Sequence, residues 1–163
     1  MKTLDVETPH GLARADLHLA SKPCAGLALG HGAGGAVSSE DLVTVKGVAL
    51  EKGFSVAIIE QPYRVAGRRS PAPARQLDAA WIAAIDYLQA RELARLRLVV
   101  GGRSLGARVA CRTAEAIGAV AVLCLAHVTN TMGQSGADFE KGHADGTADA
   151  LAVLAAIAAR YPV

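Results

Sequence analysis

The chain has 163 residues, enough for a buried core, and we expect residues 1–163 to form a single domain. Hydrophobic residues make up 52% and charged residues 20%, which excludes a largely disordered chain. The net charge of +2 is too small to favour nucleic acid or a membrane surface as a partner. No apolar signal segment follows Met1, and the longest apolar run, Ala150 to Ala159, is far below the ~20 residues of a membrane span, so we expect a cytoplasmic protein.

Apolar patterning predicts an N-terminal hairpin followed by alternating strands and helices. The predicted strands are Thr3–Thr8, Ala13–Leu19, Ala25–Leu29, Ser55–Ile59, Leu96–Val100 and Val120–Ala126. The predicted helices carry apolar stripes at Leu42, Val45 and Ala49, at Leu77, Trp81, Ala84 and Leu88, at Leu105, Val109, Ala110, Ala114 and Ile117, and over Ala148–Ala159. Residues Glu60–Arg75, with three prolines, are expected to form a loop. This order is typical of a doubly wound α/β fold with a mostly parallel sheet.

One stretch, Gly102-Arg103-Ser104-Leu105-Gly106, stands between a predicted strand and a predicted helix. A serine with one glycine two positions before it and another two positions after it, at a tight strand-to-helix turn, is typical of the nucleophile elbow of α/β-hydrolases. Side chains at the glycine positions would collide with neighbouring backbone, and the turn lifts the serine hydroxyl above the sheet. Ser104 is therefore the candidate nucleophile, and the N–H of Leu105 is a candidate oxyanion donor.

A second glycine-rich stretch, Gly30-His31-Gly32-Ala33-Gly34-Gly35, follows the third predicted strand. It is similar to the loop that supplies the other oxyanion N–H in α/β-hydrolases, with Ala33 the first choice of donor and Gly34 the next. The same residues also spell the G-x-G-x-x-G of dinucleotide-binding folds, with Glu60 at the end of the following strand. We disfavour that alternative because residues 36–38 separate the glycines from the helix, and because a hairpin precedes the strand.

A catalytic serine needs a histidine base and a carboxylate that orients it, in the chain order serine, acid, histidine. His143 lies just before the last predicted helix and Asp138 precedes it, so these are the candidate base and acid. A strand separates acid from base in the usual layout, and the interval between Asp138 and His143 is too short to contain one. His127 is the backup base, and His31 is expected to brace its own loop.

Arginines and cysteines are the remaining chemically informative residues. Arg103 and Arg64 are candidate substrate-binding residues that would favour an anionic group, although Arg64 also fits a solvated basic loop. The three cysteines, Cys24, Cys111 and Cys124, have no C-x-x-C spacing. Two of them fall inside predicted core elements, so we expect buried free thiols and predict no metal site.

Several stretches together resemble one group of small α/β-hydrolase-like proteins, which takes in uncharacterised bacterial proteins and relatives of a chromatin-complex subunit and of a testis-expressed protein. The matching stretches are Leu29–Gly35, Glu60–Arg69, Leu77–Trp81 and Gly101–Ala110, and the resemblance extends to about residue 126. It implies an α/β-hydrolase fold with Ser104 as nucleophile, and it implies no known substrate. The tail departs from the group's pattern, because Gly136-Ala137-Asp138 is followed by Phe139 where a histidine is expected. The sheet is therefore expected to be shortened at its C-terminal end.

The sequence thus predicts a serine hydrolase of esterase type that acts on a small acyl or ester substrate without a cofactor. The alternative is a catalytically inactive α/β-hydrolase-like protein that binds a ligand or a partner. A dinucleotide-binding domain is the third and least favoured interpretation. An incomplete sheet would leave an exposed edge, through which a homodimer could form.

Overall fold

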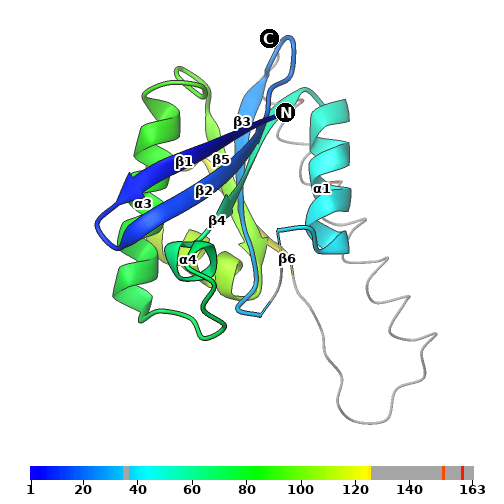
Figure 1. Ribbon diagram of the computed structural model, residues 1–163. Helices are drawn as coiled ribbons and strands as arrows, with labels where there is room; N and C mark the ends of the chain where they lie inside the picture. The colour runs from blue at the N-terminus through cyan, green and yellow to red at the C-terminus, as the bar shows by residue number, and fades with distance from the viewer. Residues whose placement is uncertain (35–36, 126–151, 153–158, 160–163) are drawn as a thin grey trace, which may run out of the picture.

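The computed structural model describes residues 1–34 and 37–125 in full, together with helical positions 152 and 159. Six strands form one mixed sheet (Figure 1) in the order β1-β2-β4-β3-β5-β6. Their bounds are Lys2–Thr8 for β1, Gly11–His18 for β2, Ala25–Gly30 for β3, Phe54–Glu60 for β4, Leu98–Arg103 for β5 and Ala121–Leu125 for β6. The predicted hairpin is confirmed, since β1 and β2 pair antiparallel, and β2 in turn pairs antiparallel with β4. The strands from β3 to β6 run parallel.

Helices cover both faces of this sheet, with α1 on one side and α3 and α4 on the other (Figure 1). Their bounds are Glu40–Glu51 for α1, Pro62–Val65 for α2, Ala74–Gln89 for α3 and Leu105–Thr113 for α4. This arrangement is the predicted doubly wound α/β fold. No helix in the described part of the chain is long and apolar enough to cross a membrane.

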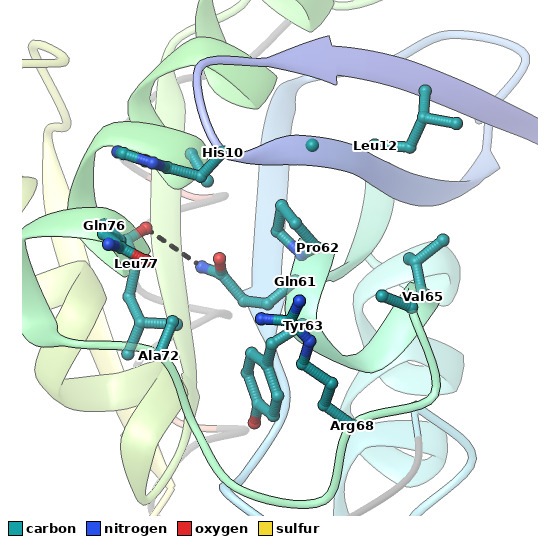
Figure 2. A pocket seen from close by; sticks show the side chains of 13 residues that line it. His10, Leu12, Gln61, Pro62, Tyr63, Val65, Arg68, Ala72, Gln76 and Leu77 are labelled. Carbon is teal, nitrogen blue, oxygen red and sulfur yellow. Dashed lines mark hydrogen bonds between the residues drawn. The ribbon is translucent and has the colours of Figure 1, made fainter.

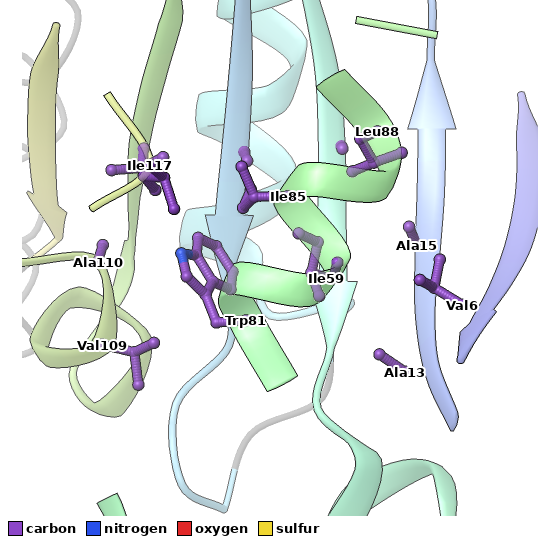
Figure 3. Packing of buried hydrophobic residues seen from close by; sticks show 14 of the residues in the cluster. Val6, Ala13, Ala15, Ile59, Trp81, Ile85, Leu88, Val109, Ala110 and Ile117 are labelled. Atoms are coloured by element: carbon purple, nitrogen blue, oxygen red, sulfur yellow. The ribbon is translucent and has the colours of Figure 1, made fainter. Parts of the chain in front are cut away.

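Each face of the sheet has its own apolar core. On one face, Trp81 and Ile85 of α3 are completely buried and belong to one apolar cluster with Ile59 of β4 and Ala15 of β2 (Figure 3). On the other face, Leu42 and the rest of the α1 stripe pack on β3, β4 and β5. The alternation of side chains along the parallel strands therefore supplies both cores, which explains why β3 and β4 read as continuous apolar runs.

The structure corrects two sequence expectations. The stretch expected to be a loop after β4 contains the short helix α2, which Pro62 begins as the first helical residue. The last described strand, β6, was expected to be apolar and buried on both faces, yet Cys124 is exposed, as is Cys111 on α4. Among the described residues β6 pairs only with β5, so it lies at an edge of the described sheet. The expectation of buried thiols at Cys111 and Cys124 is therefore wrong.

Candidate active site

Ser104 occupies the turn between β5 and α4. Its backbone has φ 50° and ψ −102°, a conformation that residues with a side chain rarely adopt and that is found mainly where surrounding structure enforces it. The N–H of Ser104 donates to the carbonyl oxygen of Leu125 at 3.4 Å, and the Ser104 carbonyl accepts from the N–H of Arg108 at 3.1 Å. Ser104 is exposed, and its hydroxyl makes no hydrogen bond to any described residue.

Close packing of three glycines brings the turn against the end of β3. Gly30 pairs with Gly102 in the parallel register of β3 and β5. A β-carbon on Gly102, whose φ is +152°, or on Gly106 would overlap the Gly30 carbonyl group. Only glycine permits this approach, which sets the start of α4 beside the loop that follows β3.

The loop after β3, residues 31–34, leaves the sheet at the same edge as Ser104. A β-carbon on Gly32 would lie 3.7 Å from the Arg103 carbonyl oxygen, so the loop and the elbow are neighbours. The backbone N–H groups of Ala33 and Leu105 donate to no acceptor within the described residues. Leu105 is the first residue of α4, where backbone N–H groups lack intrahelical acceptors.

His31 is a structural residue of this loop, as the sequence predicted. The ring is buried, Nδ1 donates to the carbonyl oxygen of Gly32 at 2.8 Å, and Nε2 accepts from the backbone N–H of Gln61 at 3.1 Å. Burial lowers the pKa of His31, against a smaller opposing effect of its hydrogen bond to Gly32. A neutral ring suits the geometry, because a proton on Nε2 would face the Gln61 N–H. With both nitrogens engaged, His31 is not placed to serve as a base.

Tyr63 holds the same loop from the other side, and sequence reasoning gave it no role. Its hydroxyl donates to the Ala33 carbonyl oxygen at 3.0 Å, and its ring lies 5.9 Å from the His31 ring. Burial raises the pKa of Tyr63, so the hydroxyl keeps its proton and remains a donor. The only sequence signal was position, since Tyr63 comes just after β4, whose carboxyl end lies at the edge where ligands bind in such sheets.

The two arginines predicted to bind substrate have different surroundings. Arg103 Nε lies 3.0 Å from Asp41 Oδ2, and this contact is an ion pair without hydrogen-bond alignment, since Arg103 Nε makes no hydrogen bond. The pair joins the end of β5 to the first turn of α1. Arg64 is half-buried on α2, and its Nη1 lies 3.5 Å from the carbonyl oxygen of Arg68. Its Nε has no hydrogen-bond partner in the described part of the chain.

A cavity of about 460 Å³ opens beside Tyr63, between the hairpin turn and the helices α2 and α3 (Figure 2). Its walls include Leu12, Val65 and Leu77, with His10 at the hairpin and Arg68 after α2. Inside, Gln61 Nε2 donates to the Leu77 carbonyl oxygen at 3.2 Å. Ser104 does not line this cavity, and Tyr63 is the residue that connects it with the loop after β3.

The predicted base and acid lie outside the described residues. His143, Asp138 and the backup His127 all fall within 126–151. The described histidines are His10, His18 and His31, and none of them contacts the Ser104 hydroxyl. No group of three or more His, Cys, Asp or Glu that could hold a metal ion occurs between residues 1 and 125 as far as they are described.

Comparison with known proteins identifies the family of the chain. A model of the alpha/beta hydrolase domain matches residues 23–138, and the chain belongs to that family. The dinucleotide-binding alternative gains no support, because α1 begins only at Glu40, well after the glycines. No curated protein matches the chain.

Solved structures resemble the chain in fold at low sequence identity. An α/β serine hydrolase without a lid from Xanthomonas campestris has a TM-score of 0.68 and 16% identity, over 79% of this chain and 62% of that one. An α-β serine hydrolase homologue from Coxiella burnetii has a TM-score of 0.67 and 12% identity, over 80% of this chain and 65% of that one. A dienelactone hydrolase from Anabaena variabilis has a TM-score of 0.66 and 16% identity, over 77% of this chain and 62% of that one. The chain thus spans less than two thirds of the length of each of these proteins.

Proposed function

We propose that the protein is a serine hydrolase of esterase type that acts on a small acyl or ester substrate. Ser104 would attack the acyl carbon, and the N–H groups of Leu105 and Ala33, with Gly34 as the alternative, would stabilise the oxyanion. The observation that carries the proposal is the backbone of Ser104, held in a rare conformation by close glycine packing. Such strain is typical of functional residues, and a structural turn here would be more stable with glycine.

His143, oriented by Asp138, is the proposed base. It would take the proton of the Ser104 hydroxyl and return it to the leaving group, as in other serine hydrolases. Arg64 and Arg103 are the proposed contacts for an anionic part of the substrate. For Arg103 this role competes with its ion pair to Asp41, whereas Arg64 has an Nε without a hydrogen-bond partner in the described residues.

A fluorophosphonate probe tests the nucleophile, because it reacts covalently with the activated serine of serine hydrolases and hardly at all with ordinary serines. We expect wild-type protein to be labelled, Ser104→Ala to lose labelling, and Ser70→Ala, a change at an exposed serine, to keep it. Loss in His143→Ala as well would support His143 as the base. Retention in His143→Ala with loss in His127→Ala would move that role to His127. Absence of labelling in folded wild-type protein would reject the hydrolase.

The second candidate is an inactive α/β-hydrolase-like protein that binds a small molecule. The cavity beside Tyr63 favours it, since its volume is within the ~300–1,000 Å³ range of ligand sites. Unlabelled wild-type protein whose unfolding temperature rises in a screen of small metabolites would support this candidate. A Leu12→Trp change should fill the cavity and abolish that rise, while Leu19→Trp, an exposed site outside the cavity, should not.

Three further expectations belong to this proposal. The narrower grouping with relatives of a chromatin-complex subunit and a testis-expressed protein stays a prediction, and so does the cytoplasmic location. A homodimer through an open sheet edge also stays a prediction, and the mass of the protein in solution, measured by light scattering, tests it directly.

A further inference from the structure

Cys111 and Cys124 form a pair of exposed thiols on neighbouring elements. Their Sγ atoms are 3.4 Å apart, although the residues are 13 positions apart in the chain. Cys111 lies on α4 and Cys124 on β6, and both side chains reach solvent. The third cysteine, Cys24, is half-buried, and its thiol lies 3.5 Å from the carbonyl oxygen of Lys52. The chain therefore contains one close thiol pair and one isolated thiol.

We propose that Cys111 and Cys124 are a modification site, at which a hydroperoxide converts the two thiols into an intramolecular disulfide that small thiols reduce again. The Cys111 thiolate attacks the terminal oxygen of the hydroperoxide, the O–O bond breaks, and Cys111 becomes a sulfenic acid as an alcohol or water leaves. The Cys124 sulfur then attacks Cys111 Sγ and displaces water. In total, two thiols and one hydroperoxide give one disulfide, one alcohol and one water, with two electrons passing from sulfur to oxygen.

The surroundings assign different roles to the two sulfurs. Burial raises the pKa of the Cys124 thiol, and its hydrogen bond with Cys111 acts in the same direction. Burial therefore disfavours the Cys124 thiolate, and either sulfur can be the donor across the 3.4 Å contact. Cys111 is the sulfur that reacts first, and Cys124 is the resolving thiol.

The geometry needs little change to form the bond. A disulfide has an S–S distance of about 2.05 Å, so the sulfurs must approach by about 1.4 Å, which side-chain rotation can supply. The cross-link would join α4 to β6. Both elements touch Ser104, since α4 begins at the next residue and the Leu125 carbonyl at the end of β6 accepts the Ser104 N–H. The modification would thus fix the elbow from two sides, whatever reaction Ser104 performs.

The test treats the fully reduced full-length chain with one equivalent of hydrogen peroxide, followed by alkylation in denaturant and digestion with trypsin. Cys111 then lies in the peptide Val109–Arg112 and Cys124 in Thr113–Lys141. We expect these two peptides to appear joined, the loss of two of the three alkylated thiols, and recovery of both with dithiothreitol. Cys24 should remain alkylated throughout.

Variants separate this site from general thiol oxidation. Cys24→Ser should form the cross-link as wild type does, while Cys111→Ser and Cys124→Ser should lose it and keep their circular dichroism spectra. Cys124→Ser should instead accumulate a sulfenic acid at Cys111, detected with dimedone. Cross-links through Cys24, links between two chains, sulfinic acid at isolated cysteines, or no reaction with tenfold excess peroxide would each overturn the proposal.

Discussion

Gly106 of α4 lies so close to Gly30 of β3 that a methyl group on its α-carbon would overlap the Gly30 carbonyl. Gly106→Ala is therefore expected to lower the free energy of unfolding by about 3 kcal/mol, since backbone on both sides leaves no flexible side chain to yield. Gly47→Ala is the matched control, because nothing lies within 4 Å of its added methyl and it is inside helix α1. That change should stabilise by up to about 1 kcal/mol. Urea unfolding measures the free energy of unfolding of both variants. Equal changes in the two variants would contradict the close contact between Gly106 and Gly30.

The backbone strain at Ser104 is measurable by comparing two substitutions. Ser104→Ala keeps a β-carbon at φ 50° and ψ −102°, whereas Ser104→Gly removes it. Strain of this kind costs about 1–3 kcal/mol, and glycine loses up to about 1 kcal/mol through the entropy of the unfolded chain. The glycine variant should consequently be more stable than the alanine variant by about 1 kcal/mol. An alanine variant as stable as the glycine variant would mean that the turn is relaxed.

The hydrogen bond from Tyr63 to the Ala33 carbonyl should contribute to holding the loop. Tyr63→Phe removes only the hydroxyl, and it is expected to cost about 1 kcal/mol of unfolding free energy. Tyr87→Phe serves as the control, because the Tyr87 ring keeps its contact with Arg91 and its hydroxyl bonds no described residue. Thermal unfolding of both variants, with amide hydrogen exchange at residues 31–34, provides the measurement. Faster exchange is expected in Tyr63→Phe alone.

Stability should depend on pH through His31. Because burial lowers its folded pKa, the unfolded state binds more protons once the pH falls below the unfolded value of about 6.5. The free energy of unfolding should therefore be constant above that pH and decrease as the pH falls further. His31→Gln removes this titration, so its curve between about pH 7.5 and 5.5 should be flatter than that of wild type. The pKa of His18 is lowered too, mainly through burial. His18→Gln should therefore also flatten the curve. Its effect should be smaller than that of His31→Gln, because His18 is less buried than His31. Parallel curves for His31→Gln and wild type would contradict the prediction.

Local pattern was sufficient to predict most of the fold. The alternation around His10 predicts the hairpin, and the spacing of Leu77, Trp81 and Leu88 predicts α3, because burial of one face or stripe imposes those periods. The two glycines of the elbow predicted a close approach that the Gly30 contacts confirm. Helix α2 was missed, since four residues are too few to show a period.

What the sequence could not predict depends on partners from distant segments. Arg103 stays a predicted substrate contact, but its ion pair with Asp41 of α1 at 3.0 Å could not be predicted, because no spacing rule relates those positions. Cys124 was expected to be buried because its strand is apolar. Its exposure follows from the position of β6 at an edge of the described sheet, which is a property of topology. The role of Tyr63 also depends on a distant segment, since its hydroxyl donates to the carbonyl oxygen of Ala33, 30 residues earlier in the chain.

The order of strands in the sheet also has a consequence for synthesis on the ribosome. The hairpin formed by β1 and β2 docks on β4, where Arg14 is paired with Glu60. At about 5–20 residues per second, translation from the end of β2 to the end of β4 takes roughly 2–8 s. During that interval the hairpin has no β4 to pair with. It is only marginally stable, because a two-stranded hairpin alone in water has little buried apolar surface. The hairpin must therefore wait for β4, whose arrival gives both the hairpin and β3 a strand to pair with.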